Sequence, residues 1–442
     1  MRTRVDLLIH NGTVLSHPNK LPHANTTIAV RNGLILDVGP QENLAQQYES
    51  PQTIDATNCL VMPGLINTHT HLAMSCFRGL GDDQHLMEWL QGTIFPAESK
   101  LTAEQVFWST QLSLAEMIRS GTTSFCDMYL FEHEVARATE IAGLRGLLGE
   151  GLFGFPSPNY GAIDAGFAYT ERLIQTWQGH PLIRIGVMPH APYTCPSALL
   201  ELAASTARKF KVPLSIHLAE TRYEEEQSRL QHGASPVEYL DHLGLLGPDL
   251  IAAHCVTVSP SDMDLLALRG VRVAHNPESN MKLASGVAPV PEMLARGIPV
   301  GLGTDGSASN NDLDMFSEMD FASKLQKVHR LDSTALPAAQ TLHMATLGGA
   351  DVLGLSQKVG SLEPGKACDA IILELHKPHL QPFYHHASQL VYAARGSDVR
   401  DTIVQGRILM RNRQLLTLDE DEIFARMKVL QDKVLKDLGR TP

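Results

Sequence analysis

Two histidines at the end of an apolar run, His69 and His71, constrain the fold of this chain more than any other feature. Residues 62–71 read MPGLINTHTH, which is typical of a buried strand that ends in polar side chains. Side chains two residues apart on a strand point to the same side, so both imidazoles can reach one ion. Two adjacent buried imidazoles would otherwise each need hydrogen-bond partners. The pattern therefore indicates a metal site at a strand end.

The composition predicts a soluble globular protein without nucleic-acid or membrane partners. Of the 442 residues, 43% are hydrophobic and 19% are charged, which suits a large core. The net charge of −12 disfavours nucleic acid and anionic membrane surfaces, and no apolar run approaches the ~20 residues of a membrane span. Six cysteines without a CxxC pair suggest free thiols, and no cleavable leader is apparent, so we expect a cytoplasmic protein.

Residues 1–61 and 361–442 both alternate short β-rich runs with turn signals, which is typical of antiparallel sheets. We expect turns at Asn11-Gly12, Asn32-Gly33 and Gln405-Gly406, and a final surface helix over residues 420–438. Since both ends share this style and flank a different middle, the sequence predicts one small β-sandwich domain built from both termini.

Residues 62–360 alternate short apolar segments with amphipathic helices, the pattern of βα units around a parallel sheet. Eight strands are expected, at residues 65–71, 122–128, 144–152, 183–190, 213–217, 250–254, 271–275 and 299–305. Helices are expected between them, for example at residues 103–120, 197–210 and 261–268. The predicted fold class is α/β, a (β/α)8 TIM-like barrel. A doubly wound open sheet is the alternative, but no GxGxxG motif follows the first strand.

Ionisable residues recur at the carboxyl ends of these strands, where barrel enzymes carry their active sites. They are His69, His71, His190, His217, His254, His275 and Asp305. The eighth strand of a closed barrel lies beside the first, so Asp305 can meet His69 and His71, while His217 points in from the opposite wall. Three imidazoles and a carboxylate suit a catalytic Zn²⁺, and Fe²⁺ would also fit. Each residue alone could equally be a hydrogen-bonded loop histidine or a turn-forming aspartate.

Glu220 stands three residues after His217, in the sequence HLAE. On a continuing strand these two side chains would face opposite sides, so Glu220 can share the site only if the chain turns inward after His217. A carboxyl there could move protons between water and a substrate nitrogen. The alternative is a solvated glutamate that opens the acidic run of residues 220–226.

The motifs that carry a resemblance to a known family are spread over the whole chain. They are PGLINTHTH (63–71), MS and RG (74–75, 78–79), PAE (96–98), GTT (121–123), HLAE (217–220), HC (254–255), HNP with SN (275–277, 279–280), GTDG (303–306), SNNDLD (309–314) and PGKACD (364–369). In these stretches the chain resembles the amidohydrolase superfamily and, within it, the 5-methylthioadenosine/S-adenosylhomocysteine deaminase family.

The resemblance implies that His69, His71, His217 and Asp305 hold one divalent metal, with Zn²⁺ expected and Fe²⁺ as the alternative. Relatives with two metals share a carbamylated lysine at the end of the fourth strand, and residues 183–190 contain no lysine. By the same resemblance, Glu220 would donate a proton to the substrate nitrogen N1. His254 would orient the attacking water, and Asp305 would take its proton.

By the same resemblance, Glu98 and His190 contact the ribose of a nucleoside. Trp89, with Met87 and Phe95, would shape an apolar pocket for the 5′ substituent, although such residues are more often plain core. The implied activity is hydrolytic deamination of the adenine ring of 5′-methylthioadenosine to 5′-methylthioinosine, releasing ammonia. Adenosine and S-adenosylhomocysteine are the further substrates that the family suggests.

One departure from the family concerns residues 151–170, which contain no arginine or lysine. Members that accept S-adenosylhomocysteine well use an arginine there to pair its carboxylate. Burying that carboxylate without a partner is costly, so we expect better activity on 5′-methylthioadenosine or adenosine.

Two rival functions follow from other interpretations of the same residues. An aminohydrolase of another purine, a pterin or a triazine would have no ribose for Glu98 and His190 to hold. A barrel that has lost its metal and acts as an interaction scaffold is disfavoured by the intact ligand set. Deaminases of the HxE and PCxxC type are excluded because the chain contains no PCxxC. A homo-oligomer is compatible with the sequence.

Overall fold

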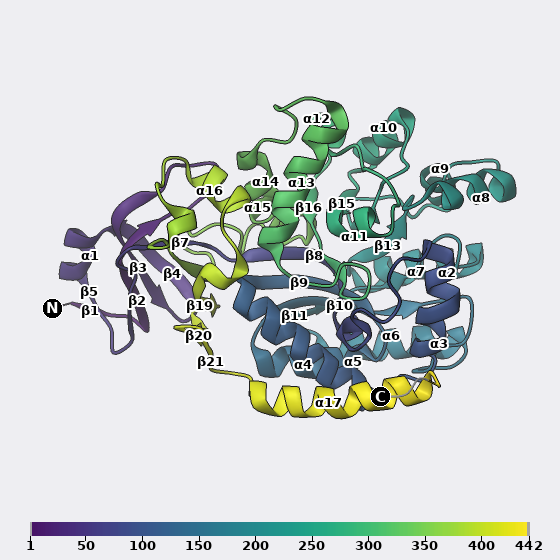
Figure 1. The fold of residues 1–442 in the computed structure, drawn as a ribbon, viewed down its shortest axis with the longest axis horizontal. Coiled ribbons are helices and arrows are strands. Elements are labelled where there is room, and N and C mark those ends of the chain that lie inside the picture. The colour runs from purple at the N-terminus through teal and green to yellow at the C-terminus, as the bar shows by residue number, and fades with distance from the viewer. Residues whose placement is uncertain (1, 440–442) are drawn as a thin grey trace.

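Parallel strands at the centre of the molecule form a closed ring, and a separate sheet stands beside them (Figure 1). The computed structural model describes residues 2–439. The strands of the ring are β8 (Leu65–His71), β9 (Thr122–Tyr129), β10 (Arg145–Leu152), β11 (Ile183–Ile185), β12 (Met188–Pro189), β13 (Leu214–Leu218), β14 (Leu250–His254), β15 (Arg272–His275), β16 (Val300–Leu302) and β17 (Asp305–Gly306).

The ring closes at two places between its two sheets. One sheet has the order β11-β10-β9-β8-β17 with β12 on β10, and the other has the order β13-β14-β15-β16. A parallel bridge between Val187 and Leu214 joins them on one side, and on the other Thr68 Oγ1 donates to the Leu302 carbonyl at 2.9 Å. The chain therefore forms a TIM-like barrel, as the sequence predicts.

Two of the eight predicted strands are interrupted, which corrects the sequence analysis. The stretch expected over residues 183–190 divides into β11 and β12, because Gly186 and Val187 leave the ladder between them. The stretch expected over residues 299–305 divides into β16 and β17, and Gly303 lies in the gap. A Cβ on Gly303 would lie 2.9 Å from the His69 nitrogen, so only glycine lets the last strand approach the first this closely.

Helices surround the ring and carry the connections. In the barrel they are α4 (Ala103–Ser120), α5 (Glu132–Ala142), α6 (Ile163–Trp177), α7 (Ser197–Phe210), α8 (Arg222–His232), α9 (Pro236–His242), α10 (Pro260–Arg269), α11 (Pro277–Lys282), α12 (Val290–Ala295), α13 (Met315–Arg330), α14 (Ala338–Met344) and α15 (Leu347–Val352). The predicted helices at residues 103–120 and 197–210 are confirmed at both ends, and the one at 261–268 is α10. Helix α4 begins with a capping box between Thr102 and Gln105.

A nine-stranded sheet unites the two ends of the chain. Its order is β21-β20-β19-β18-β7-β2-β3-β4, with β6 on β2. The bounds are β2 (Leu7–Val14), β3 (His23–Arg31), β4 (Leu34–Pro40), β6 (Thr53–Asp55), β7 (Cys59–Pro63), β18 (Ala370–Glu374), β19 (Val399–Val404), β20 (Arg407–Arg411) and β21 (Gln414–Leu415). The antiparallel pair of β7 and β18 joins the two ends. That this sheet forms a two-layered β-sandwich, with boundaries at residues 61 and 361, stays a prediction.

The remaining elements are short, apart from the last helix. They are β1 (Thr3–Arg4), β5 (Tyr48–Glu49), α1 (Gln41–Gln47), α2 (Leu86–Trp89), α3 (Phe95–Glu98), α16 (His386–Tyr392) and α17 (Glu420–Asp437), with the 3₁₀ helices η1 (Leu72–Phe77), η3 (Pro378–Leu380) and η4 (Gly396–Asp398) and the π-helix η2 (Leu90–Ile94) between α2 and α3. The final helix is confirmed, and α17 runs along the outside of the barrel (Figure 1). No helix in the described part of the chain has both the length and the apolar character that a membrane crossing requires.

Two of the three predicted turns are confirmed and one is wrong. Asn32-Gly33 joins β3 to β4, with both residues at positive φ, and Gln405-Gly406 joins β19 to β20 in the same way. Asn11-Gly12 does not turn the chain. It lies inside β2, where the pairing with β3 shifts register at a bulge, and Asn11 takes up the extra residue at φ 61°.

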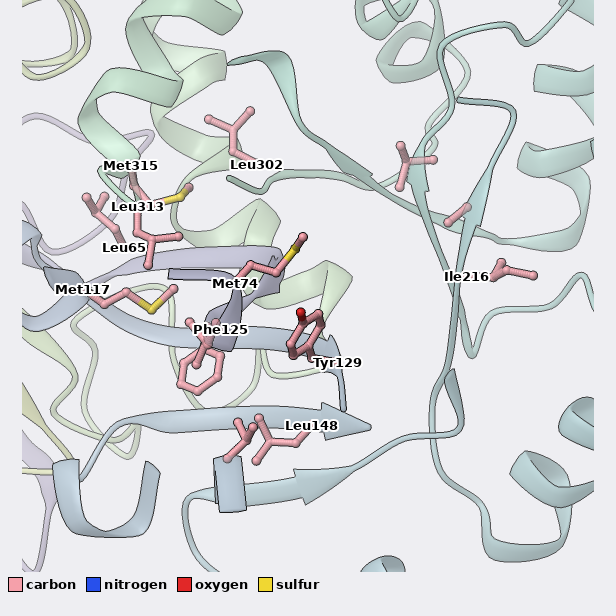
Figure 2. Close-up of a cluster of buried hydrophobic side chains, with 14 of the residues drawn as sticks. Leu65, Met74, Met117, Phe125, Tyr129, Leu148, Ile216, Leu302, Leu313 and Met315 are labelled. Atoms are coloured by element: carbon pink, nitrogen blue, oxygen red, sulfur yellow. The ribbon is translucent and has the colours of Figure 1, made fainter. Parts of the chain in front are cut away.

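The hydrophobic core lies between the barrel strands and the helices around them (Figure 2). Leu65, Phe125 and Leu148 come from the neighbouring strands β8, β9 and β10, and each is fully buried or nearly so. Met117 of α4 belongs to the same cluster. This packing fixes the strands from behind and leaves their carboxyl ends to carry polar side chains.

A buried ion pair ties the terminal sheet to the barrel. Arg145, the first residue of β10, donates from Nε to Asp369 Oδ2 at 3.0 Å and from Nη2 to Oδ1 at 3.3 Å. Asp369 lies just before β18, and its Oδ1 also accepts the backbone N–H of Gln405 at 2.7 Å. The two side chains are 6% and 2% exposed, so each charge depends on the other.

We expect the substitution Asp369→Asn to destabilise the protein by about 3–5 kcal/mol, because it leaves the buried Arg145 guanidinium without a countercharge. Asp241→Asn is the matched control, since Asp241 makes the same two-bonded pair with Arg269, which is 48% exposed. The control should cost at most about 1 kcal/mol. Thermal unfolding of both variants measures the difference, and equal shifts in Tm would contradict the prediction.

Candidate metal centre and active site

Five polar side chains from four strands converge inside the carboxyl end of the barrel. His69 and His71 end β8, His217 lies on β13, His254 ends β14, and Asp305 begins β17. Asp305 is paired with Thr70, which lies between the two histidines of β8. The centroid of the His69 imidazole ring lies 4.8 Å from the ring centroids of both His71 and His217. Barrel closure therefore brings together residues that are far apart in the sequence.

The distances between donor atoms suit a single cation. His71 Nε2 lies 3.2 Å from His217 Nε2 and 3.1 Å from Asp305 Oδ1, and His69 Nε2 lies 3.5 Å from the same oxygen. Zinc ligands at bonds of about 2.0–2.1 Å and the tetrahedral angle are separated by about 3.3–3.4 Å. These three separations are therefore close to those between the ligands of a tetrahedral site.

The outer ring nitrogens, Nδ1, make hydrogen bonds that orient the inner nitrogens, Nε2, toward each other. His71 Nδ1 faces the Met128 carbonyl, and His217 Nδ1 faces the His190 carbonyl at 2.7 Å. A carbonyl only accepts, so both Nδ1 atoms carry the proton and both Nε2 atoms present lone pairs. Neither nitrogen of the buried His69 has a hydrogen-bond partner, and neither has Asp305 Oδ1. Lone pairs that converge in this way need a cation between them, so the residues fit a metal.

The charge states of His69 and His217 agree with that assignment, whereas His71 is drawn toward its protonated form. Burial lowers the pKa of His69 to about 4 and that of His217 well below its ordinary value, so both imidazoles are neutral, as metal ligands must be. Burial also lowers the pKa of His71, but the Asp305 carboxylate outweighs it and raises that pKa to about 9. A proton and a metal would therefore compete for the same lone pair, on His71 Nε2.

His254 is the fifth member of the cluster, so two different sets of four ligands are possible. The ligand atoms of His69, His217, His254 and Asp305 all lie within 4.8 Å of one another. The predicted set has His71 in place of His254, and the shorter distances from His71 favour it. His254 Nδ1 meets Asn280 Oδ1 at 2.9 Å, which makes Nε2 the acceptor, and Asn276 Nδ2 lies 3.4 Å from Nε2. Such an acceptor can orient a water molecule.

A pocket opens over the cluster and includes four further predicted site residues. Glu98, Glu220, His190 and Trp89 all line it. Its apolar wall comes mainly from the segment of α2, η2 and α3, with one aromatic from beyond β10, and includes Leu86, Trp89, Leu90, Ile94, Phe95 and Phe153. Met87, which was predicted with Trp89, does not line it. Among the described residues, the lining contains no lysine and no arginine.

Glu98 and His190 are each held in this pocket by a neighbouring hydroxyl. Glu98 is 9% exposed and accepts the Tyr129 hydroxyl at 2.8 Å, while burial raises its pKa to about 7. His190 Nδ1 lies 2.8 Å from Thr194 Oγ1, and burial lowers its pKa to about 3. Both groups are therefore largely or partly uncharged near neutral pH and can act as hydrogen-bonding groups.

His275 ends β15 as predicted but does not reach the pocket. Its two ring nitrogens are buried without hydrogen-bond partners, and it is absent from the pocket lining. Burial lowers its pKa to about 3, so it is a neutral histidine behind the site. The sequence correctly placed His275 at a strand end and assigned it no role.

Several residues that support the site were missed by the sequence analysis. Asp305 Oδ2 accepts the hydroxyls of Ser279 at 2.6 Å and Ser309 at 2.8 Å, which turns Oδ1 toward the histidines. Asp127 Oδ1 accepts Thr70 Oγ1 at 2.7 Å and the Leu72 N–H at 2.6 Å, on either side of His71. Tyr129 was not predicted as a site residue, because the second strand was expected to end one residue too early, at residue 128.

Comparison with known proteins adds four findings. A model of the amidohydrolase family matches residues 60–409. The 5-methylthioadenosine/S-adenosylhomocysteine deaminase of Syntrophobacter fumaroxidans is 53% identical, over 97% of this chain and 98% of its own length. The 5′-deoxyadenosine deaminase of Methanosarcina barkeri is 45% identical, over 95% and 96%. A crystal structure of an adenosine deaminase from Xanthomonas campestris with bound zinc superposes with a TM-score of 0.97, at 38% identity, over 99% and 100%.

The raised pKa of Glu98 predicts a pH-dependent effect of Glu98→Gln on metal-free protein. The folded carboxyl holds its proton up to a pKa of about 7, above the ordinary 4.5, so the wild-type protein loses stability as pH rises through that window. Glutamine cannot ionise. The stability of the variant relative to wild type should therefore rise by about 3 kcal/mol between pH 4 and 8.

Thermal unfolding across this pH range measures the change. Glu104→Gln, at a side chain that is 71% exposed, is the control and should show no such trend. A constant difference between wild type and Glu98→Gln at all pH values would rule the prediction out.

Proposed function

Since the chain belongs to the amidohydrolase family, we propose that it is a metal-dependent deaminase that hydrolyses the 6-amino group of adenosines with a small 5′ substituent. Its 53% identity to a 5-methylthioadenosine/S-adenosylhomocysteine deaminase supports 5′-methylthioadenosine as a substrate and 5′-methylthioinosine as the product. The chain is a hydrolase that acts on C–N bonds. The metal-free scaffold is therefore set aside.

One observation carries the proposal: a single pocket contains both a cation-binding cluster and the buried carboxyl of Glu220. Glu220 is 5% exposed, and burial raises its pKa, which favours the protonated carboxyl. Deamination needs these two things together, a nucleophile made from water and an acid for the ring nitrogen. The ligands of the proposal are His69, His71, His217 and Asp305, and Zn²⁺ is the proposed metal.

When bound, the cation would lower the pKa of a coordinated water from about 16 to near 7, which makes a nucleophile available. In our mechanism Glu220 gives its proton to N1 of the adenine as C6 becomes tetrahedral. Asp305 takes one proton from the attacking water and passes it to the amino group, which leaves as ammonia. The second water proton returns to Glu220 as the C6 carbonyl forms. His254, held through Nδ1 by Asn280, accepts a hydrogen bond from the water.

The pocket residues supply the affinity for a nucleoside in this proposal. The Glu98 carboxyl would accept the ribose hydroxyls, and Tyr129 keeps it in place. His190 would donate or accept on the same sugar. The apolar wall around Trp89 and Phe95 would cover the 5′ substituent and keep water from it.

The charge of the pocket favours an uncharged 5′ substituent. S-adenosylhomocysteine carries a carboxylate that needs a cationic partner, and the described lining offers none. A methylthio group, a hydroxyl or a hydrogen needs only the apolar wall. The similarity to a 5′-deoxyadenosine deaminase agrees with this. A cytoplasmic location stays a prediction, as does any homo-oligomer.

We expect Glu220→Gln to retain one metal per chain and to lose about 10²–10⁴-fold in kcat, because glutamine cannot donate the N1 proton. An ultraviolet assay of the conversion of adenine to hypoxanthine measures turnover, and metal analysis measures occupancy. The wild-type enzyme should turn over nucleosides and leave guanine, pterins and triazines unchanged. Near-normal turnover by the variant would show that the proton route is wrong, and activity confined to free bases would overturn the function.

We further expect kcat/KM for 5′-methylthioadenosine to exceed that for S-adenosylhomocysteine by at least about tenfold, because the homocysteine carboxylate meets no cation. The same assay compares the two with adenosine and 5′-deoxyadenosine. An enzyme that prefers S-adenosylhomocysteine would contradict this account of the pocket.

A further inference from the structure

Glu220 reaches the pocket because the chain changes direction at the residue before it. Strand β13 ends at Leu218, and Ala219 has a φ of 51°, in the left-handed region that alanine seldom adopts. This single residue turns the chain inward, which is the condition for Glu220 to share the site with His217. Such a backbone conformation costs free energy and persists only where neighbouring groups hold it.

A second carboxylate holds this turn. Glu224 is 2% exposed, and its two oxygens accept two consecutive backbone N–H groups. Oε1 accepts from Ala219 at 2.9 Å, and Oε2 accepts from Glu220 at 2.8 Å. Burial raises the pKa of Glu224, and the two N–H donors oppose that rise because both favour the ionised form. Glu224 does not line the pocket, so it touches no substrate.

The arrangement differs from an ordinary helix cap. In α9, Glu238 at the third helical position reaches back to the N–H of its own N-cap residue, Ser235, at 2.8 Å. Glu224 occupies the same position in α8, where Thr221 is the N-cap residue. Its carboxylate passes beyond Thr221 to the two residues before it. The Glu224 carboxylate therefore binds the turn that carries Glu220 instead of capping α8.

The carbonyl of Ala219 is held as firmly as its N–H. It accepts the N–H of Val256 at 2.9 Å, the N–H of Thr257 at 2.9 Å and the Thr257 hydroxyl at 3.1 Å. These donors follow β14, just after His254, which itself has a φ of 74°. The turns that carry Glu220 and His254 therefore brace each other.

We propose that Glu224 is a positioning residue for the proton transfer: its carboxylate fixes the left-handed turn at Ala219 and so aims the Glu220 carboxyl at the substrate. The inference rests on the deaminase function proposed above. It differs from a helix-capping role, because a cap would affect the stability of α8 and leave the geometry of Glu220 alone.

The test compares Glu224→Gln with the matched control Glu238→Gln. Glutamine at position 224 presents one acceptor and one donor to two N–H groups, so one hydrogen bond becomes a donor–donor clash. At position 238 the carboxylate caps α9 and contacts no site residue. We expect Glu224→Gln to lower kcat by about 10–100-fold, with KM and metal content close to wild type, and Glu238→Gln to leave kcat unchanged.

A double-mutant cycle with Glu220→Gln shows whether Glu224 acts through Glu220. If it does, adding Glu224→Gln to the Glu220→Gln variant changes kcat by no more than about twofold. An equal loss in both backgrounds would overturn the inference, as would a kcat for Glu224→Gln within about twofold of wild type. Glu224→Asp, whose shorter carboxylate cannot reach both N–H groups, replaces the glutamine variant if that one does not fold.

A crystal structure of the Glu224 variant decides the placement without any substrate. We expect the Glu220 carboxyl to leave its position in the pocket while His217 stays in place. An unmoved Glu220 would overturn the inference even if the protein has another activity. A wild-type enzyme that deaminates no nucleoside would instead defeat the proposed function, so the two failures are distinguishable.

Discussion

The pairing of the last barrel strand with the first is the contact on which the site depends. Asp305 meets His69 and His71 only because β17 lies against β8, with Asp305 opposite Thr70. Asn67 Nδ2 bonds Thr304 Oγ1 at 2.8 Å, and Gly303 lets the two backbones approach. Without this closure the carboxylate and the imidazoles would stand at opposite ends of an open sheet. The metal centre is therefore a property of the ring rather than of any one segment.

The site also concentrates backbone strain at its strand ends. Ala219, His254, Cys255 and Asp305 all have positive φ, and none of them is glycine. The first three end or directly follow a barrel strand, and Asp305 begins β17 after the break that follows β16. The turn at Ala219 is held because its N–H donates to Glu224 and its carbonyl accepts the Thr257 hydroxyl, and the hydroxyls of Ser279 and Ser309 donate to the Asp305 side chain. The rigidity of the pocket comes from such supporting contacts as much as from the core.

Electrostatics divides the tasks among the buried groups. Desolvation keeps His69, His190 and His217 neutral and raises the pKa of Glu98 to about 7, while the carboxylate of Asp305 stays ionised. The pKa of Asp305 is held well below its ordinary value, since the surrounding histidines outweigh its burial. One wall of the same pocket is apolar, so a nucleoside can place its base near the charges and its 5′ end against side chains such as Trp89.

The sequence alone determined the fold class, the strand ends that carry the chemistry and the proposed ligands, because periodicity and motif spacing are local properties. It also located Glu220, under the condition that the chain turns after His217. Only the tertiary structure showed how that condition is met, through Glu224 and the carbonyl contacts of Ala219, because these bonds join separate turns. It likewise revealed the bulge at Asn11-Gly12 and the breaks in two strands, since pairing partners rather than local propensity decide where a ladder is interrupted.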